Sequence, residues 1–162
     1  MGNRDLAATF SVPQSPEAVF AAINDVRGWW SGDIEGDTDR LGAVFSYRNK
    51  DVHRSTQEIT EFVPGRRVVW RVLGSYLSFL KDKTEWNGTR IVFDIARKGD
   101  ETEVRFTHEG IDPDQECFGV CSKAWTFYVT DSLKNLIVRG QGTPNRKEAT
   151  GRSGATRAAV AT

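Results

Sequence analysis

The chain has 162 residues, and its 22 basic side chains balance its 22 acidic ones, which leaves no formal net charge. A chain of this length can form one domain that buries its core without metals or disulfides. The basic tail leaves the rest of the chain mildly acidic, which argues against the basic stripe that a nucleic-acid surface needs, and no apolar run is long enough to span a membrane. The N-terminal segment lacks the apolar centre of a signal peptide, so we expect a cytoplasmic protein with no nucleic-acid and no membrane partner.

The start of the chain predicts a strand followed by two short helices. Residues 6–12, LAATFSV, alternate apolar with small or polar side chains, which is typical of a half-buried strand. Ser15 followed by Pro16 predicts a helix start, since serine caps a helix N-terminus and proline fits its first position. A second short turn leads into the tryptophan pair at residues 29–30. We expect either one to pack under the helices and the other to lie at an opening, or both to be ordinary packing residues.

Between residues 33 and 110 the period of the hydrophobic pattern changes to two, which predicts antiparallel strands. Three strands carry AVFSYR, STQEITEFV and RRVVWRV, with turn sequences at residues 49–51 and 64–65 between them. Two more, TRIVFDIARK and TEVRFTHEG, are joined by a tight hairpin at residues 99–100. The connection at residues 74–88 contains large apolar side chains and is interpreted either as a cover over a pocket or as a distorted strand of the same sheet.

Residues 112–140 form the longest periodic segment, and Gly140 is placed to end a helix. One arc of this helix collects large and soft side chains, and a curved sheet gripping it would bury both apolar faces. Residues 143–162 carry no aromatic side chain and no period, so we divide the chain into a domain of residues 1–142 and a disordered tail of residues 143–162. The predicted arc consists of Cys117, Phe118, Cys121, Ala124, Trp125, Tyr128, Val129, Ser132 and Leu136.

Cys117 and Cys121 are the only cysteines of the chain and lie four residues apart. A structural zinc site needs four ligands, and besides carboxylates only His53 and His108 could join them. A disulfide needs Cβ atoms closer together than positions i and i+4 of a helix allow, so it would require the helix to fray. We therefore interpret both cysteines as reduced thiols that fill the core or line a cavity, with no metal and no cofactor.

His108 ends a strand on its apolar face. In that position a histidine either hydrogen-bonds within the core or anchors the polar group of a ligand inside a cavity, here beside Tyr128 and Ser132. The sequence contains no phosphate-binding, metalloprotease or serine-hydrolase motif. We therefore predict no catalytic residue, and we expect binding rather than catalysis.

Several phrases of the sequence resemble one known superfamily. FSVPQSPEAVFAAI, GWWSGDIEG, EITEFVPGRRVVWRV, EWNGTRIVFDI and FTHEGI are similar to the START-like (SRPBCC) superfamily, and most similar to its branch of activator of heat-shock protein 90 ATPase homologues. The resemblance covers about residues 6–144. It implies an α+β helix-grip fold of the birch-pollen-allergen-like kind, with six to seven antiparallel strands curved around a long C-terminal helix and two short helices after the first strand.

The resemblance also implies a cavity between sheet and helix that often holds a hydrophobic ligand. We expect this protein to bind a small hydrophobic molecule there as a monomer or a weak homodimer. Two alternatives stay open, because one fold serves many functions. One is a co-chaperone-like module with a chaperone partner, and the other is a cyclase acting on aromatic polyketide carbonyl compounds. The predicted ligand-binding residues are Trp30, Phe45, Trp70, Phe93, Phe106, His108, Cys121, Trp125 and Tyr128.

Overall fold

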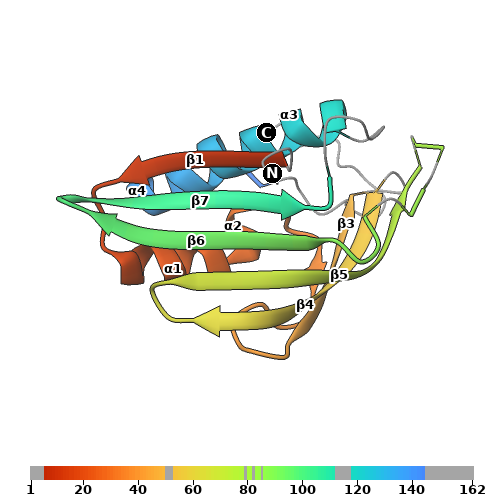
Figure 1. Cartoon of the computed structure of the whole chain (residues 1–162), viewed down its shortest axis with the longest axis horizontal. Coiled ribbons are helices and arrows are strands. Elements are labelled where there is room, and N and C mark those ends of the chain that lie inside the picture. Colours follow the sequence, from red (N-terminus) through yellow and green to blue (C-terminus); the bar gives the residue numbers. More distant parts are fainter. Residues whose placement is uncertain are drawn as a thin grey trace.

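The computed structural model describes residues 6–49, 53–78, 80–81, 83–84, 86–111 and 118–144. In this part of the chain seven strands form one antiparallel sheet in the order β1-β7-β6-β5-β4-β3-β2 (Figure 1). The strands are β1 Leu6–Val12, β2 Ile34–Glu35, β3 Val44–Asn49, β4 His53–Val63, β5 Arg67–Leu77, β6 Arg90–Lys98 and β7 Glu101–Glu109.

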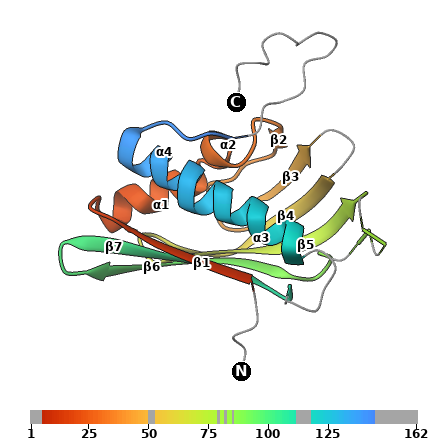
Figure 2. The same cartoon turned by 90° about the horizontal axis from the view of Figure 1, so that it is seen from above.

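The helices that the structure describes lie on one face of this sheet, and β3, β4 and β5 curve up toward the longest of them (Figure 2). Helices α1 Pro16–Asn24 and α2 Val26–Trp29 follow β1, and the C-terminal helix runs through α3 Phe118–Phe127, η1 Tyr128–Leu133 and α4 Lys134–Arg139. This arrangement confirms the predicted α+β helix-grip fold. None of the helices that the structure describes is long and apolar enough to cross a membrane.

The curvature of the sheet comes mainly from β4 and β5, which are both 11 residues long. Their pairing shifts register twice, between Thr56 and Gln57 and again between Ile59 and Glu61. Register shifts of this kind bend a strand and increase its twist. The bend carries the far ends of β4 and β5 toward α3, and it therefore determines where a space between sheet and helix can open.

The capping and turn residues behave as their types predict. The Ser15 hydroxyl accepts a hydrogen bond of 3.1 Å from the backbone N–H of Ala18 at the start of α1. Gly99 turns β6 into β7 with a φ of 63°, and Gly140 ends α4 with a φ of 81°. Both glycines occupy the left-handed region that other residues avoid. The two-residue strand β2 was not predicted, since it is too short to show a period.

The C-terminal helix departs from a regular period at η1, which is a π-helical turn. Such a turn holds extra residues, so the residues after it face a different direction than a period of 3.6 predicts. Leu133 is consequently fully buried, whereas Leu136, which the predicted arc included, is only partly buried. Ser132, inside the π-helical turn, is buried as predicted.

Parts of the predicted C-terminal helix and of the predicted tail lie outside the described residues. The expected helix start at residues 112–117 and residues 145–162 of the expected tail lie outside the described residues. Within the described part, the backbone N–H of Thr143 donates a 2.7 Å hydrogen bond to the Ser132 hydroxyl, which in turn donates to the Trp29 carbonyl. The domain boundary at residue 142 stays a prediction.

Both adjacent tryptophans are buried, with exposures of 0% for Trp29 and 2% for Trp30. The Trp29 indole lies beneath α1, where its Nε1 donates a 3.0 Å hydrogen bond to the Ile23 carbonyl. Trp30 follows the end of α2 and faces the other way along the core, toward β3. The pair thus connects the packing under the first helices to the space under α3.

Candidate ligand-binding pocket

A pocket of about 290 Å³ lies between α3 and the ends of β3 and β4, and we call it the inner pocket. Its walls come from the end of α2, the closing residues of the β3–β4 hairpin, the connection after β5, and α3. Asn49 and His53 face each other as register partners at the hairpin end. The lining residues are Trp30, Tyr47, Asn49, His53, Trp86, Val120, Cys121, Ala124, Trp125 and Tyr128.

Aromatic rings form two stacked pairs in the walls of the inner pocket. Trp30 lies parallel to Tyr47, with ring centroids 4.0 Å apart and planes 4° apart. Trp86 is stacked on Trp125 at 5.8 Å with planes 16° apart, and Trp30 reaches Trp125 at 5.0 Å. Stacked and edge-to-face contacts of this kind are favourable beyond the area they bury. The pocket therefore presents flat apolar surfaces held in fixed orientations.

Trp86 enters the pocket from the connection between β5 and β6. Its carbonyl accepts two hydrogen bonds from Thr89, one of 3.0 Å from the backbone N–H and one of 2.6 Å from the hydroxyl. The first residues of this connection belong to a regular strand, because β5 continues to Leu77. Trp86, near its end, lines the pocket. Both interpretations of residues 74–88 thus hold for different parts of it, and Phe79 lies outside the described residues.

His53 is the ionisable polar residue at the hairpin end of the pocket. Its ring makes edge-to-face contacts with Tyr47 at 4.9 Å and with Trp86 at 4.5 Å. Its Nε2 is buried and has no hydrogen-bond partner among the described residues. Burial lowers the pKa of His53 to about 3, so the ring is neutral at physiological pH.

His108 lies deeper and does not line the pocket. Its Nδ1 accepts a 3.1 Å hydrogen bond from Trp125 Nε1, and its Nε2 lies 2.8 Å from the Thr89 hydroxyl. Since that hydroxyl donates to the Trp86 carbonyl, His108 Nε2 carries the hydrogen and donates to Thr89. Burial first, and the neighbouring His53 second, lower the pKa of His108 to about 3. Of the two predicted roles, the geometry is that of a satisfied core histidine.

The structure divides the nine predicted ligand-binding residues into two groups. Four of them line the inner pocket, and the other five form the aromatic core beneath it. The strand and helix faces of these residues were predicted correctly. The two groups differ in their position along the strands, because Trp29 and Trp30 fill the middle of the space under the helix. The pocket group is Trp30, Cys121, Trp125 and Tyr128, and the core group is Phe45, Trp70, Phe93, Phe106 and His108.

Sequence reasoning missed five pocket residues, namely Tyr47, Asn49, His53, Trp86 and Val120, while Ala124 belonged to the predicted arc. A signal existed for Tyr47, because it shares a strand face with the predicted Phe45. His53 was considered only as a metal ligand, and Trp86 only as the point where strand pairing resumes. Among the described residues no group of three or more histidine, cysteine or acidic side chains is placed to hold a metal ion.

The expectation of free thiols is wrong for Cys121, which is disulfide-bonded. Cys117 is the only other cysteine of the chain, and it lies outside the described residues. The argument against a disulfide assumed that both residues belong to one regular helix. The described part of helix α3 begins at Phe118 and holds only Cys121 of the two cysteines. Cys121 still lines the pocket.

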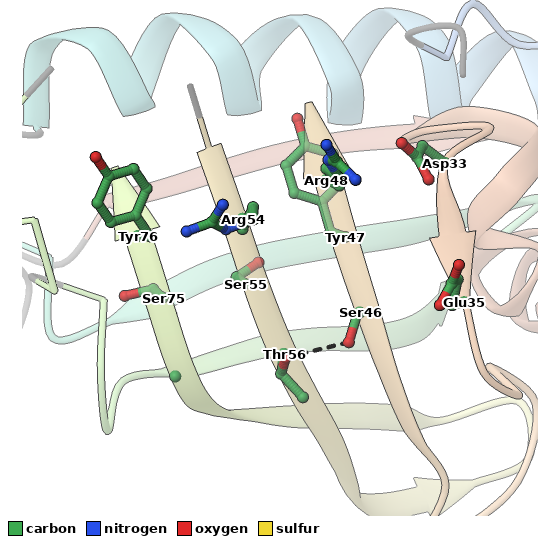
Figure 3. A pocket seen from close by; sticks show the side chains of 11 residues that line it. Asp33, Glu35, Ser46, Tyr47, Arg48, Arg54, Ser55, Thr56, Ser75 and Tyr76 are labelled. Carbon is green, nitrogen blue, oxygen red and sulfur yellow. Dashed lines mark hydrogen bonds between the residues drawn. The ribbon is translucent and has the colours of Figure 1, made fainter. Parts of the chain in front are cut away.

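A second hollow, of about 410 Å³, lies on the opposite face of β3, β4 and β5 (Figure 3), and we call it the outer groove. Arg48 and Arg54 are register partners across it, and the Arg54 guanidinium lies 4.7 Å from the centre of the Tyr76 ring. The hydroxyls of Ser46 and Thr56 are hydrogen-bonded at 3.1 Å. The groove is lined by Asp33, Glu35, Ser46, Tyr47, Arg48, Arg54, Ser55, Thr56, Gly74, Ser75 and Tyr76.

The model of the family described as Activator of Hsp90 ATPase homolog 1-like protein matches residues 13–137, which include α1, the strands β2 to β7 and most of the C-terminal helix. The chain belongs to this family. Membership in the Activator of Hsp90 ATPase homolog 1-like family agrees with the resemblance seen in the sequence. No curated protein matches the sequence.

Solved structures share the helix-grip fold of this family member. The solution structure of the Aha1 dimer from Colwellia psychrerythraea has a TM-score of 0.69 at 23% identity, over 85% of this chain and 98% of that one. DynU16, from the dynemicin biosynthetic locus, has a TM-score of 0.66 at 15% identity, over 90% of this chain and 51% of that one. CalU16 from Micromonospora echinospora has a TM-score of 0.60 at 15% identity, over 85% of this chain and 76% of that one. At these identities the likeness shows the fold alone.

Proposed function

We propose that this protein binds a small, mostly apolar aromatic molecule in the inner pocket. The observation that carries the proposal is the set of aromatic walls, with Trp30 on Tyr47 and Trp86 on Trp125 around a volume of about 290 Å³. Ligand sites are typically concave, mostly apolar and from about 300 Å³ upward, with a few polar groups that fix orientation. The volume and the flat walls suit a molecule of one or two fused rings.

The chemistry of the pocket supports binding rather than proton transfer. General acid–base catalysis works best when the pKa of the catalytic group lies near the working pH. The pKa of His53 is lowered to about 3, which makes its ring a weak base. The described lining includes no carboxylate that could act as its partner. These features favour a site that holds a neutral molecule over one that moves protons.

The test is a titration with 2-naphthol, followed by calorimetry and by the NMR signals of the tryptophan indole N–H groups. We expect the signals of Trp30, Trp86 and Trp125 to shift, and that of Trp29 to stay, because Trp29 does not line the pocket. Binding within this pocket then requires the space beside Ala124, an exposed residue of α3 that lines it.

The variant Ala124→Trp should weaken 2-naphthol binding by about tenfold or more, because its ring would occupy the pocket. The free energy of unfolding should change by less than about 1 kcal/mol, since the position is open to solvent. Thr126→Trp is the matched control, because Thr126 is exposed on the same helix but does not line the pocket. Equal binding by both variants and the wild type, or no shift of the three indole signals, would contradict the proposal.

A further inference from the structure

The inner face of β4 carries three polar residues in a row, at its end nearest the inner pocket. His53, Ser55 and Gln57 occupy alternate positions on this face, and the next inward residue is Ile59. Each of the three polar residues has one buried side-chain atom without a hydrogen-bond partner among the described residues, namely His53 Nε2, Ser55 Oγ and Gln57 Oε1. Buried polar atoms are satisfied in most native structures, so a row of exceptions requires an explanation.

His53 differs from the other two because it lines the inner pocket. Its ring is held edge-on between Tyr47 and Trp86, two members of the pocket's aromatic walls. A ring fixed in this way holds its Nε2 in one place and does not need a ligand to order it. An unpaired nitrogen on a residue that lines an apolar pocket is the kind of group that a bound molecule can pair with.

The second histidine shows that this fold can satisfy a buried imidazole from its own side chains. His108 contacts the same Trp86 ring at 4.7 Å, yet its two nitrogens are bonded to Trp125 and Thr89. Of the two histidines, only the one that lines the pocket has an unmade hydrogen bond among the described residues. Leaving such a group unpaired is unfavourable, and a ligand's polar group at this point would remove that cost.

We propose that His53 Nε2 is the polar anchor of the inner pocket, and that the pocket selects planar aromatic molecules carrying a hydroxyl group. This inference rests on the proposed function and specifies its ligand class. A hydroxyl can donate to a bare ring nitrogen or accept from a protonated one, so it suits either tautomer of a neutral histidine. A neutral ring also gives no particular attraction to an anionic group. The pocket should therefore bind phenols and alcohols more tightly than carboxylic acids.

The experiment compares 2-naphthol with 2-methylnaphthalene, which replaces the hydroxyl by a methyl group of similar size. Dissociation constants are measured by NMR titration for the wild type, for His53→Phe and for His53→Gln. We expect the wild type to prefer 2-naphthol by about tenfold or more, since a site with an unpaired polar group penalises the analogue that cannot satisfy it. His53→Phe should reduce that preference to below about threefold, mainly by weakening 2-naphthol.

His53→Gln should restore part of the preference, because its amide can both donate and accept. Retained binding of 2-methylnaphthalene by His53→Phe shows that the variant is folded with its pocket intact. If that variant does not fold, the preference of the wild type and the behaviour of His53→Gln still decide the question.

Three outcomes overturn the inference. Equal affinity of the wild type for both probes overturns it while the binding function stands. A preference that survives His53→Phe and disappears in Tyr128→Phe assigns the anchor to the Tyr128 hydroxyl instead. Failure of both probes to bind, or binding that Ala124→Trp does not weaken, overturns the proposed function and this inference with it.

Discussion

The inner pocket and the outer groove are two faces of the same strands, and they have opposite chemistry. On β3 and β4, His53 faces inward to an aromatic cavity, while Arg48 and Arg54 face outward to a charged groove, and Tyr47 lines both hollows. Because side chains alternate along a strand, one residue of shift would exchange the two surfaces. The larger hollow is the polar one, so size alone does not identify the face that suits an apolar ligand.

The largest effect is expected on the inner face, from Trp125→Ala. The Trp125 ring contacts Trp30, Trp86 and Phe106. Its loss should lower the free energy of unfolding by about 3–5 kcal/mol and abolish 2-naphthol binding. Urea denaturation measures the first effect. Phe127→Ala, at an exposed position of the same helix, should cost less than about 1 kcal/mol. Similar costs for the two variants would show that the aromatic stack is not the core of the fold.

A second test sharpens the border between the pocket and the core beneath it. His108→Phe keeps a ring in place but leaves the Trp125 indole N–H without its acceptor, so it should cost about 1–3 kcal/mol. His53→Phe removes no hydrogen bond found among the described residues and should be close to neutral. Both values come from denaturant titrations at pH 7. The comparison would break down if His53→Phe cost as much as His108→Phe.

Acid should destabilise the fold through the two histidines of the inner face. The pKa of each buried histidine is about 3 in the folded protein and about 6.5 in an unfolded chain, so the unfolded state binds more protons between these values. Stability therefore falls as the pH drops below about 7. Between pH 7 and pH 6 each histidine should lower the free energy of unfolding by about 0.7 kcal/mol. The variant His53→Phe should show a correspondingly smaller loss over this step, and an unchanged loss would contradict the assignment.

The smallest effect is expected from the outer groove. Arg54→Ala removes an exposed guanidinium and its contact with the Tyr76 ring, which is worth about 0.5–1 kcal/mol at most. The affinity for 2-naphthol should stay as in the wild type, because Arg54 lies on the opposite face from the pocket. A loss of binding comparable to that of Ala124→Trp would mean that the two faces do not act separately.

Most of the fold could be predicted from the sequence because its signals are local. Alternation identified β1 and β3 to β7, and the residues that cap or end elements, Ser15, Gly99 and Gly140, act as expected. The π-helical turn was not predictable from a period of 3.6, and it exchanged Leu136 for Leu133 in the core. Local signals thus predicted which elements form, but not in every case which side chains of an element face the core.

The site was predicted less well, because period gives the face of a residue and not its depth. Phe93 and Phe106 share the inner face with the pocket residues, yet they meet each other at 5.4 Å in the packed core. Whether a cavity opens beside a residue depends on how the bulges of β4 and β5 bend the sheet, which no periodicity records. Trp86 enters the pocket from a connection, where the sequence carries no period, and His53 is a polar residue at the first position of β4.

The five tryptophans of the chain form one connected array. Trp86 neighbours Trp125 at 5.8 Å, which neighbours Trp30 at 5.0 Å. Trp30 neighbours Trp70 at 5.7 Å, and Trp70 neighbours Trp29 at 6.3 Å. At such spacings the electronic transitions of the indoles couple, so light absorbed by one ring is shared along the series. The near-ultraviolet circular dichroism of this protein should then behave as a single collective signal, and a guest that tilts Trp86 or Trp125 would alter the optical response of the entire interior.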